Sequence, residues 1–277
     1  MKGKLKTKAG GKQMTIRFCS LASGSSGNCQ YIETDRVRLL VDAGLSGKRI
    51  QESLISIEVD PSTINGILVT HEHKDHIHGV GVLSRRFNIP IYTNEKTWEC
   101  MKTEIGEINE KNIIIFDTDK IFEIQDLNIH PFQLSHDAIE PVGYSFYHKN
   151  IKISLVTDTG YVSEKVKENI RNSQLLLIES NHDVEMLKVG KYPWYLKKRI
   201  LSEKGHLSNE DAGKLLAEVL YGKNECILLG HLSKENNFPE LAYQTVANIL
   251  TEKGLDVVKD INLELTYRDR PSKVFIF

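Results

Sequence analysis

The sequence has few cysteines, no long apolar run and almost no net charge. Its four cysteines, Cys19, Cys29, Cys100 and Cys226, form no Cys-x-x-Cys pair. Their spacing argues against a disulfide framework and a thiolate zinc site, and it favours a reducing cytoplasm. No apolar stretch approaches the roughly 18 to 20 residues of a membrane span, and we expect no export signal and no membrane contact. The 36 basic and 37 acidic residues nearly balance, so any contact with nucleic acid must come from a local patch.

The remaining composition is that of a globular chain. With 277 residues and 40% hydrophobic content, it can build a substantial core. Residues 1–13 carry five lysines and almost nothing apolar, which indicates an added tag or a disordered basic arm. A basic arm that contacts nucleic acid is the alternative. No repeat or linker divides residues 14–277, so we expect one domain there.

Strand and helix patterns alternate along residues 14–277. The first three expected strands, at 15–21, 30–33 and 37–42, predict a β-meander. Further strands are expected at 66–70, 89–93, 113–116, 127–134, 143–148, 151–156, 175–179 and 226–230, and helices at 48–57, 80–87, 95–105 and about 208–221. The periodicity by itself establishes an α/β fold. Two strand-rich halves, each with its own helices, suggest a four-layer αββα sandwich of two packed sheets with helices outside.

The segment THEHKDHIHG, residues 70–79, gathers metal-capable side chains directly after an apolar run. His71 and His73 would point to different sides of a helix, but on extended or loop backbone they can converge on one ion. We therefore expect the motif on a loop. Asp75 and His76 follow and can serve a second ion, because oxygen and nitrogen ligands suit zinc or manganese. Two neighbouring ions can share a bridging hydroxide, which is a nucleophile at neutral pH.

Three more candidate ligands follow apolar stretches later in the chain: His136 in QLSHDA, Asp158 in LVTDTG and His231 in ILLGHLS. The alternative interpretation of residues 70–79 is a solvated histidine-rich loop. Each of the three later candidates places one imidazole or carboxylate in the loop after an expected strand. Active sites are commonly built on loops of this kind, which argues against that alternative.

The pattern His-x-His-x-Asp-His at 71–76, followed by His136, Asp158 and His231, resembles the metallo-β-lactamase superfamily. The resemblance implies the αββα sandwich and two divalent metal ions, zinc or manganese. It implies that His71, His73 and His136 hold one ion, that Asp75, His76 and His231 hold the other, and that Asp158 bridges them. The segments SLASGSSGN, THEHKDHIHG, GHLSN and GHLSKENN also resemble the YycJ/WalJ-like branch. That branch implies a bacterial cytoplasmic, metal-dependent 5′-to-3′ DNA exonuclease associated with mismatch repair or a cell-wall signalling operon.

A second resemblance concerns His206 in KGHLSNED and Glu179 in LLLIES. In order and placement they are similar to the proton relay of RNase Z, the tRNA 3′-processing endonuclease of the superfamily. An imidazole steadied by a carboxylate can protonate a departing alkoxide. The resemblance thus implies catalytic roles for His206 and Glu179, beside Asp75, which would orient the hydroxide. The alternative is a helix cap at His206 and a structural ion pair at Glu179.

Polar loop residues near the ligands are candidate substrate contacts. Uncharged donors after His231 suit phosphate oxygens, and the segment SGSSGN can turn backbone N–H groups toward an anion. The candidate substrate-binding residues are Ser25, Ser26, Asn28, Ser208, Ser233, Asn236 and Asn237. The alternatives are a flexible hairpin turn at SGSSGN and a polar helix entrance before Pro239.

The segment 187–204 combines six Lys or Arg residues with Tyr192, Trp194 and Tyr195. Cations can bind a phosphate backbone while aromatic rings stack on bases, as expected for single-stranded nucleic acid. A solvated helix face with a few core aromatic residues is the alternative.

These features together favour a dinuclear-metal phosphodiesterase, a 5′-to-3′ DNA exonuclease linked to mismatch repair, with a metal-bridging hydroxide as nucleophile. The expected partner is nucleic acid, DNA above all. One alternative is a small-molecule carbonyl hydrolase of the lactonase or thioesterase type, and another is a metal-bearing regulator of cell-wall signalling. Whether the chain forms a homo-oligomer stays open.

Overall fold

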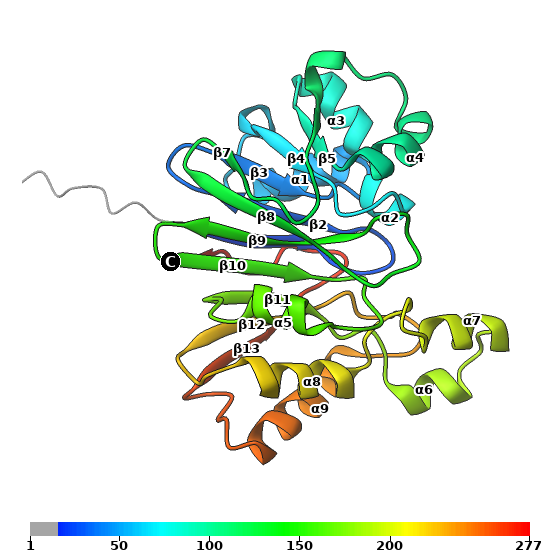
Figure 1. The fold of residues 1–277 in the computed structure, drawn as a ribbon. Helices are drawn as coiled ribbons and strands as arrows, with labels where there is room; N and C mark the ends of the chain where they lie inside the picture. Colours follow the sequence, from blue (N-terminus) through cyan, green and yellow to red (C-terminus); the bar gives the residue numbers. More distant parts are fainter. Residues whose placement is uncertain (1–15) are drawn as a thin grey trace, which may run out of the picture.

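Two β-sheets of seven strands each pack face to face, and helices cover their outer faces (Figure 1). This computed structural model describes residues 16–277, so the tag or basic arm expected at residues 1–13 lies outside the described residues. The expected α/β class and four-layer αββα sandwich are confirmed.

The first sheet has the strand order β14-β1-β2-β3-β4-β5-β6. Its strands are β1 (Arg17–Ala22), β2 (Cys29–Glu33), β3 (Arg38–Val41), β4 (Gly66–Leu68), β5 (Ile91–Thr93), β6 (Ile113–Ile115) and β14 (Phe275–Ile276). β1, β2 and β3 pair antiparallel, which confirms the expected meander, and β3 to β6 pair parallel. The carboxyl ends of β3 and β4 therefore lie at the same edge of the sheet.

The second sheet has the order β13-β12-β11-β10-β9-β8-β7. Its strands are β7 (Phe122–Ile124), β8 (Leu127–Gln133), β9 (Val142–His148), β10 (Ile151–Val156), β11 (Leu175–Glu179), β12 (Glu225–Gly230) and β13 (Ile261–Leu265). β7 to β10 pair antiparallel and β10 to β13 pair parallel. Three of these strands, β8, β10 and β12, end where the chain turns toward the candidate ligands.

Three hydrophobic layers hold the sandwich together. One lies between the sheets, and the other two lie between each sheet and its helices. Strand β11 shows how one strand serves two layers: Leu175 and Leu177 point to the layer between the sheets, while Leu176 and Ile178 point to the helices. A strand buried on both faces needs an apolar residue at every position, which is why its sequence is a continuous apolar run.

The helices are α1 (Gly47–Ser56), α2 (Lys74–Ile77), α3 (Val80–Phe87), α4 (Glu95–Ile105), α5 (Glu164–Ile170), α6 (Val184–Val189), α7 (Trp194–Ile200), α8 (Asn209–Val219) and α9 (Pro239–Glu252). α1, α3 and α4 pack on the first sheet, and α5, α8 and α9 pack on the second. In α8, Ala212, Leu215, Leu216 and Val219 form one apolar face against the second sheet. Within residues 16–277, no helix is long and apolar enough to cross a membrane.

The expected loop at residues 71–76 is only partly correct. His71 and His73 lie on irregular backbone, but Asp75 and His76 belong to the short helix α2. The backbone N–H groups of His76 and Ile77 both donate to the carbonyl of His73. This single helical turn reverses the chain, so that His76 returns toward His71 instead of continuing outward.

Candidate metal centre

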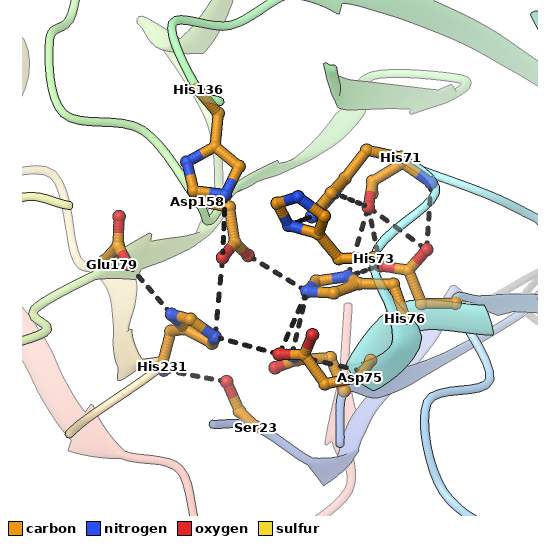
Figure 2. A network of polar contacts seen from close by, with 12 residues as sticks. Ser23, His71, His73, Asp75, His76, His136, Asp158, Glu179 and His231 are labelled. Carbon is orange, nitrogen blue, oxygen red and sulfur yellow. Dashed lines mark hydrogen bonds and ion pairs between the residues drawn. The ribbon is translucent and has the colours of Figure 1, made fainter. Parts of the chain in front are cut away.

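Candidate ligands reach one edge of the sandwich from both sheets. His71, His73, Asp75 and His76 follow β4 of the first sheet, whereas His136, Asp158 and His231 follow β8, β10 and β12 of the second. Figure 2 shows these side chains pointing toward a common centre. The site therefore depends on the packing of the two sheets against each other.

Sharp backbone turns aim several of these side chains. Asp158 and His231, the second residue after β10 and the first after β12, have φ values of 59° and 54°. Asp42, the first residue after β3, has a φ of 61°. A left-handed conformation costs a non-glycine residue about 1–3 kcal/mol and persists only where the surroundings enforce it. Here it turns the chain at the strand end and places the side chain over the edge of the sheet.

The structure brings all seven candidate ligands together, and the two sets of three that the superfamily resemblance implies each form a close group. Ligand atoms of His71, His73 and His136 lie within 4.8 Å of one another, and so do those of Asp75, His76 and His231. Asp158 forms a third such group with His71 and His76, so it lies between the other two (Figure 2). Their roles as metal ligands stay a prediction.

Hydrogen bonds behind the imidazoles orient their rings. His76 Nδ1 lies 2.7 Å from Asp42 Oδ2, and His231 Nδ1 lies 2.8 Å from Glu179 Oε1. A carboxylate only accepts, so in each neutral ring Nδ1 carries the proton and Nε2 keeps a lone pair. His136 Nδ1 similarly donates to the carbonyl oxygen of Gly205, at 3.1 Å. Fixing one tautomer prepares the other nitrogen for a cation.

Two residues behind the ligands were missed in the sequence. Asp42 contacts His76 as described, and the hydroxyl of Thr70 lies 2.9 Å from Asp42 Oδ2 and 2.9 Å from His71 Nδ1. Asp42 is the last residue of the expected strand 37–42, so it carried the same signal as the ligands: a carboxylate at the end of an apolar run. Its contact with His76 is between residues far apart in the chain and could not be found from spacing.

The cluster fits divalent cations. Asp158 Oδ2 and His231 Nε2 are buried and have no hydrogen-bond partner among the described residues. Buried polar atoms are rarely left unpaired, and imidazole nitrogens with carboxylate oxygens are the donor set of zinc and manganese. Burial holds the pKa of His71 well below its usual value, so this imidazole is neutral. Burial also lowers the pKa of His76 and of His231, but the neighbouring carboxylates outweigh burial and raise both above their usual value. A cation would therefore displace a proton from these two rings.

His206 and Glu179 lie directly beside the candidate ligands. His206 Nδ1 is 2.7 Å from Glu179 Oε1, the same oxygen that contacts His231 Nδ1. Burial lowers the pKa of His206, but the Glu179 carboxylate outweighs burial and raises this pKa above its usual value. His206 is therefore held by a buried carboxylate that favours its protonated form, and its side chain is 18% exposed.

The seven candidate substrate-binding residues differ in exposure. Only Ser25 and Ser26 are exposed. Ser208 caps α8, because its hydroxyl accepts from the Asp211 N–H and donates to the Asp211 carboxylate. Asn237 donates to the carbonyls of Ser180 and Asn181 and accepts from the Phe238 N–H.

Three of these side chains have partners within the fold. Ser208 and Asn237 use their side chains to hold the fold, as described above. Asn28 is buried between Gly24 and His76, and its Nδ2 lies 3.0 Å from His76 Nε2. A substrate-binding role for these three side chains stays a prediction. Ser233 and Asn236 are buried as well, and the Ser233 hydroxyl accepts from the Asn236 N–H.

The segment 187–204 forms the end of α6, the whole of α7 and the loops around them, which project from the body on the side where α2 lies (Figure 1). Trp194 and Tyr195 are 61% and 76% exposed, so the alternative of core aromatic residues is wrong for these two. Arg199 forms an ion pair with Asp137, the residue after His136. Lys197 is buried and donates to the Lys188 carbonyl. The segment is thus fastened beside the candidate ligands with two aromatic rings facing solvent.

The two-sheet sandwich with clustered histidines and aspartates at one edge defines a class of metal-binding α/β proteins. A family model described as "Beta-lactamase superfamily domain" matches residues 37–229. The match covers more than half of the chain and includes every candidate ligand except His231, which follows it by two residues. The chain belongs to the metallo-β-lactamase superfamily.

Similar proteins are known by sequence and by structure. Exodeoxyribonuclease YycJ from Bacillus anthracis is 46% identical over 261 residues, which cover 94% of this chain and 99% of that protein. Exodeoxyribonuclease WalJ from Streptococcus pneumoniae is 46% identical over 259 residues, which cover 93% of this chain and 96% of that protein. The crystal structure of YhfI, a metallo-β-lactamase fold protein from Bacillus subtilis, matches with a TM-score of 0.73 at 15% identity, covering 95% of this chain and all of that one. This structural likeness shows the fold alone.

Proposed function

We propose that the protein is a metal-dependent nuclease, and specifically a dinuclear phosphodiesterase that removes nucleotides from the 5′ end of DNA. The names of the YycJ and WalJ relatives, at 46% identity over nearly the whole chain, support DNA exonuclease activity. A link to mismatch repair is part of the proposal and is supported by resemblance to the YycJ/WalJ-like branch.

The observation that carries the proposal is the contact between His206 and Glu179 beside seven clustered candidate ligands. Hydrolysis of a phosphodiester releases an alkoxide, which needs a proton. A role for His206 in supplying that proton is supported by its Nδ1–H contact with Glu179, which leaves Nε2 as the other nitrogen of a partly exposed ring.

The residues divide the reaction between them. His71, His73 and His136 would hold one ion, Asp75, His76 and His231 the other, and Asp158 would contact both. When bound, two divalent ions, zinc or manganese, supply a water nucleophile at neutral pH and neutralise charge on the phosphate. Asp75 accepts a hydrogen bond from the attacking water and orients it. His206 protonates the 3′ oxygen that leaves the phosphorus, and Glu179 stabilises the ring while it is charged.

Segment 187–204 supports a nucleic-acid substrate over a small molecule. Trp194 and Tyr195 offer stacking surfaces for unpaired bases, and Lys198 lies 5.7 Å from the centre of the Trp194 ring. Lys191, Lys198 and Lys204 form no salt bridge within residues 16–277, so their charges are free for backbone phosphates. A lactonase or thioesterase has no use for this surface.

A cleavage time course tests the function. Single- and double-stranded DNA and matching RNA, labelled at either end, are incubated with zinc, manganese or EDTA. Release of mononucleotides from the 5′ end of DNA, only with metal, is the expected result. If fully metal-loaded protein cleaves no strand but hydrolyses a lactone or thioester, the proposal is wrong and the carbonyl hydrolase takes its place.

A further inference from the structure

A cavity of about 490 Å³ lies next to the candidate metal centre and has no part in the reaction above. Its walls include Ser23, Ser25, Ser26, Lys234, Arg268 and Asp269. A second cavity, of about 310 Å³, shares Ser25 and Ser26 and includes the candidate ligand Asp75. The two exposed serines therefore line both cavities, and the larger cavity borders the one that includes Asp75.

One backbone hydrogen bond and two that involve side-chain hydroxyls fix the larger cavity relative to the candidate ligands. The Ser23 N–H donates to the Tyr267 carbonyl at 2.9 Å, and the Ser23 hydroxyl accepts from the His231 N–H at 2.9 Å. Thr266 donates through its hydroxyl to the carbonyl of Leu229, at 3.0 Å. The wall that carries Arg268 is thus attached to β12, the strand that ends at His231. A group bound there is held at a constant distance from the reacting atoms.

The charges of this cavity suit a phosphate. Arg268 is half-buried and Lys234 is exposed, and neither forms a salt bridge within the described part of the chain. Asp269 and Glu235 are the acidic groups that act on Arg268, and neither carboxylate is within salt-bridge distance. An arginine that is partly desolvated and unpaired is well suited to a phosphomonoester, whose oxygens it can bind through two parallel N–H bonds.

Gly24 makes room for the arginine. A Cβ atom at this position would lie 2.7 Å from Arg268 Cγ, and the Gly24 φ of 148° disfavours any other residue. The Arg268 stem therefore packs directly on the backbone of the loop that contributes Ser25 and Ser26. Loop and arginine form one wall of the cavity.

We propose that this cavity holds the terminal nucleotide of the strand and that Arg268 and Lys234 bind its 5′-phosphate. The inference rests on the proposed function, because 5′-to-3′ hydrolysis breaks the bond from phosphorus to the 3′ oxygen of the terminal nucleotide. The phosphate stays on the shortened strand, so each cycle creates a new 5′-phosphate. A site that binds the 5′-phosphate would therefore bind the new strand end after each cycle and hold it for the next cleavage.

The test compares kcat/KM on one single-stranded DNA oligonucleotide with a 5′-phosphate and with a 5′-hydroxyl. Wild-type protein is expected to prefer the phosphorylated strand by about 10- to 100-fold, the range of a charge-assisted contact. Arg268→Gln should bring the ratio close to one, and Arg268→Lys should restore part of it. Arg270→Gln is the matched control, because Arg270 lies outside this cavity, stacked 4.1 Å from the centre of the Tyr267 ring.

A binding measurement separates this inference from the proposed function. Isothermal titration of metal-free protein with thymidine 5′-monophosphate should give an affinity about 10-fold or more lower in Arg268→Gln, and thymidine itself should bind weakly to both. DNA hydrolysis by the wild type without preference for a 5′-phosphate would overturn the inference and leave the function standing. A protein that hydrolyses neither DNA nor bis(p-nitrophenyl) phosphate with metal would overturn both. Equal loss on both strands in Arg268→Gln would assign Arg268 to the fold instead.

Discussion

His206 is the residue on which the proposed proton transfer depends. His206→Ala is expected to lower turnover by roughly 10² to 10⁴, because the leaving oxygen then departs without a positioned acid. Metal content should be unchanged, since the His206 contact is with Glu179. Turnover and bound metal are measured on the same samples, with His130→Gln, on β8 and outside the site, as the control. Loss of metal in the alanine variant would make His206 a ligand or a support for one.

Another histidine ties stability to pH. His182 is 1% exposed, and both of its ring nitrogens lack hydrogen-bond partners among the described residues. Burial lowers its pKa to about 4 from an ordinary value of 6.5. The unfolded chain therefore binds more protons than the folded one between these values, and the free energy of unfolding falls as pH drops through that window.

Replacing this side chain should remove that dependence. Between pH 7 and pH 5, the wild type is expected to lose about 2 kcal/mol more unfolding free energy than His182→Leu, which cannot be protonated. Urea unfolding of both proteins at the two pH values measures the difference, and the titration of all other groups cancels in the comparison. Equal slopes in the two proteins would show that His182 is already protonated or solvated in the folded state.

At the scale of elements, α7 carries the surface proposed to hold DNA. Trp194→Ala is expected to raise KM for single-stranded DNA by about 5- to 150-fold, because stacking of one base contributes roughly 1–3 kcal/mol. Turnover at saturation should change little, since Trp194 is not among the clustered groups of the site. Tyr221→Ala is a matched control: Tyr221 is 52% exposed and has Lys223 over its ring, but it lies beyond the carboxyl end of α8. A similar rise in both variants would contradict a specific role for α7.

The elements also show which parts of the fold are predictable from sequence. Strands 151–156 and 175–179 are found at the predicted residues. In 175–179 the reason is clear, because a strand buried on both faces has a nearly continuous apolar sequence. β7 and β14, with three and two residues, were not predicted. Their positions are set by pairing with β8 and β1, and this pairing cannot be read from the local sequence pattern. The four residues of α2 are likewise too few to show helical periodicity.

The candidate ligands that directly follow an apolar strand were predictable from the sequence. His136, Asp158 and His231 each follow an apolar strand, and the structure brings them to the motif at 71–76. Contacts behind them were not predictable, because Asp42 meets His76 and Glu179 meets His231 across 34 and 52 positions of the chain. The structural partners of Asn28, Ser208 and Asn237 were not predictable for a related reason, since a polar loop residue bound to the protein and one free for a ligand look alike in sequence.

At the scale of the whole molecule, the site joins the two halves of the sandwich. Four candidate ligands come from the first sheet and three from the second, so bound cations would connect the sheets. Cations that bind only the folded protein stabilise it by about 2.7 to 4.1 kcal/mol at 100 to 1,000 times their dissociation constant. For a chain of this size, that corresponds to a rise in Tm of roughly 5 to 16 °C.

Metal removal should therefore lower the stability of the entire fold and not of one loop alone. Calorimetric scans with EDTA, zinc and manganese measure the shift in Tm. We expect one unfolding transition, whose Tm falls when metal is removed. Asp158→Ala is expected to show a much smaller shift, because Asp158 lies between the two ligand groups. A full shift in that variant would show that the ions bind without Asp158, and no shift in the wild type would place metal binding outside this edge of the sandwich.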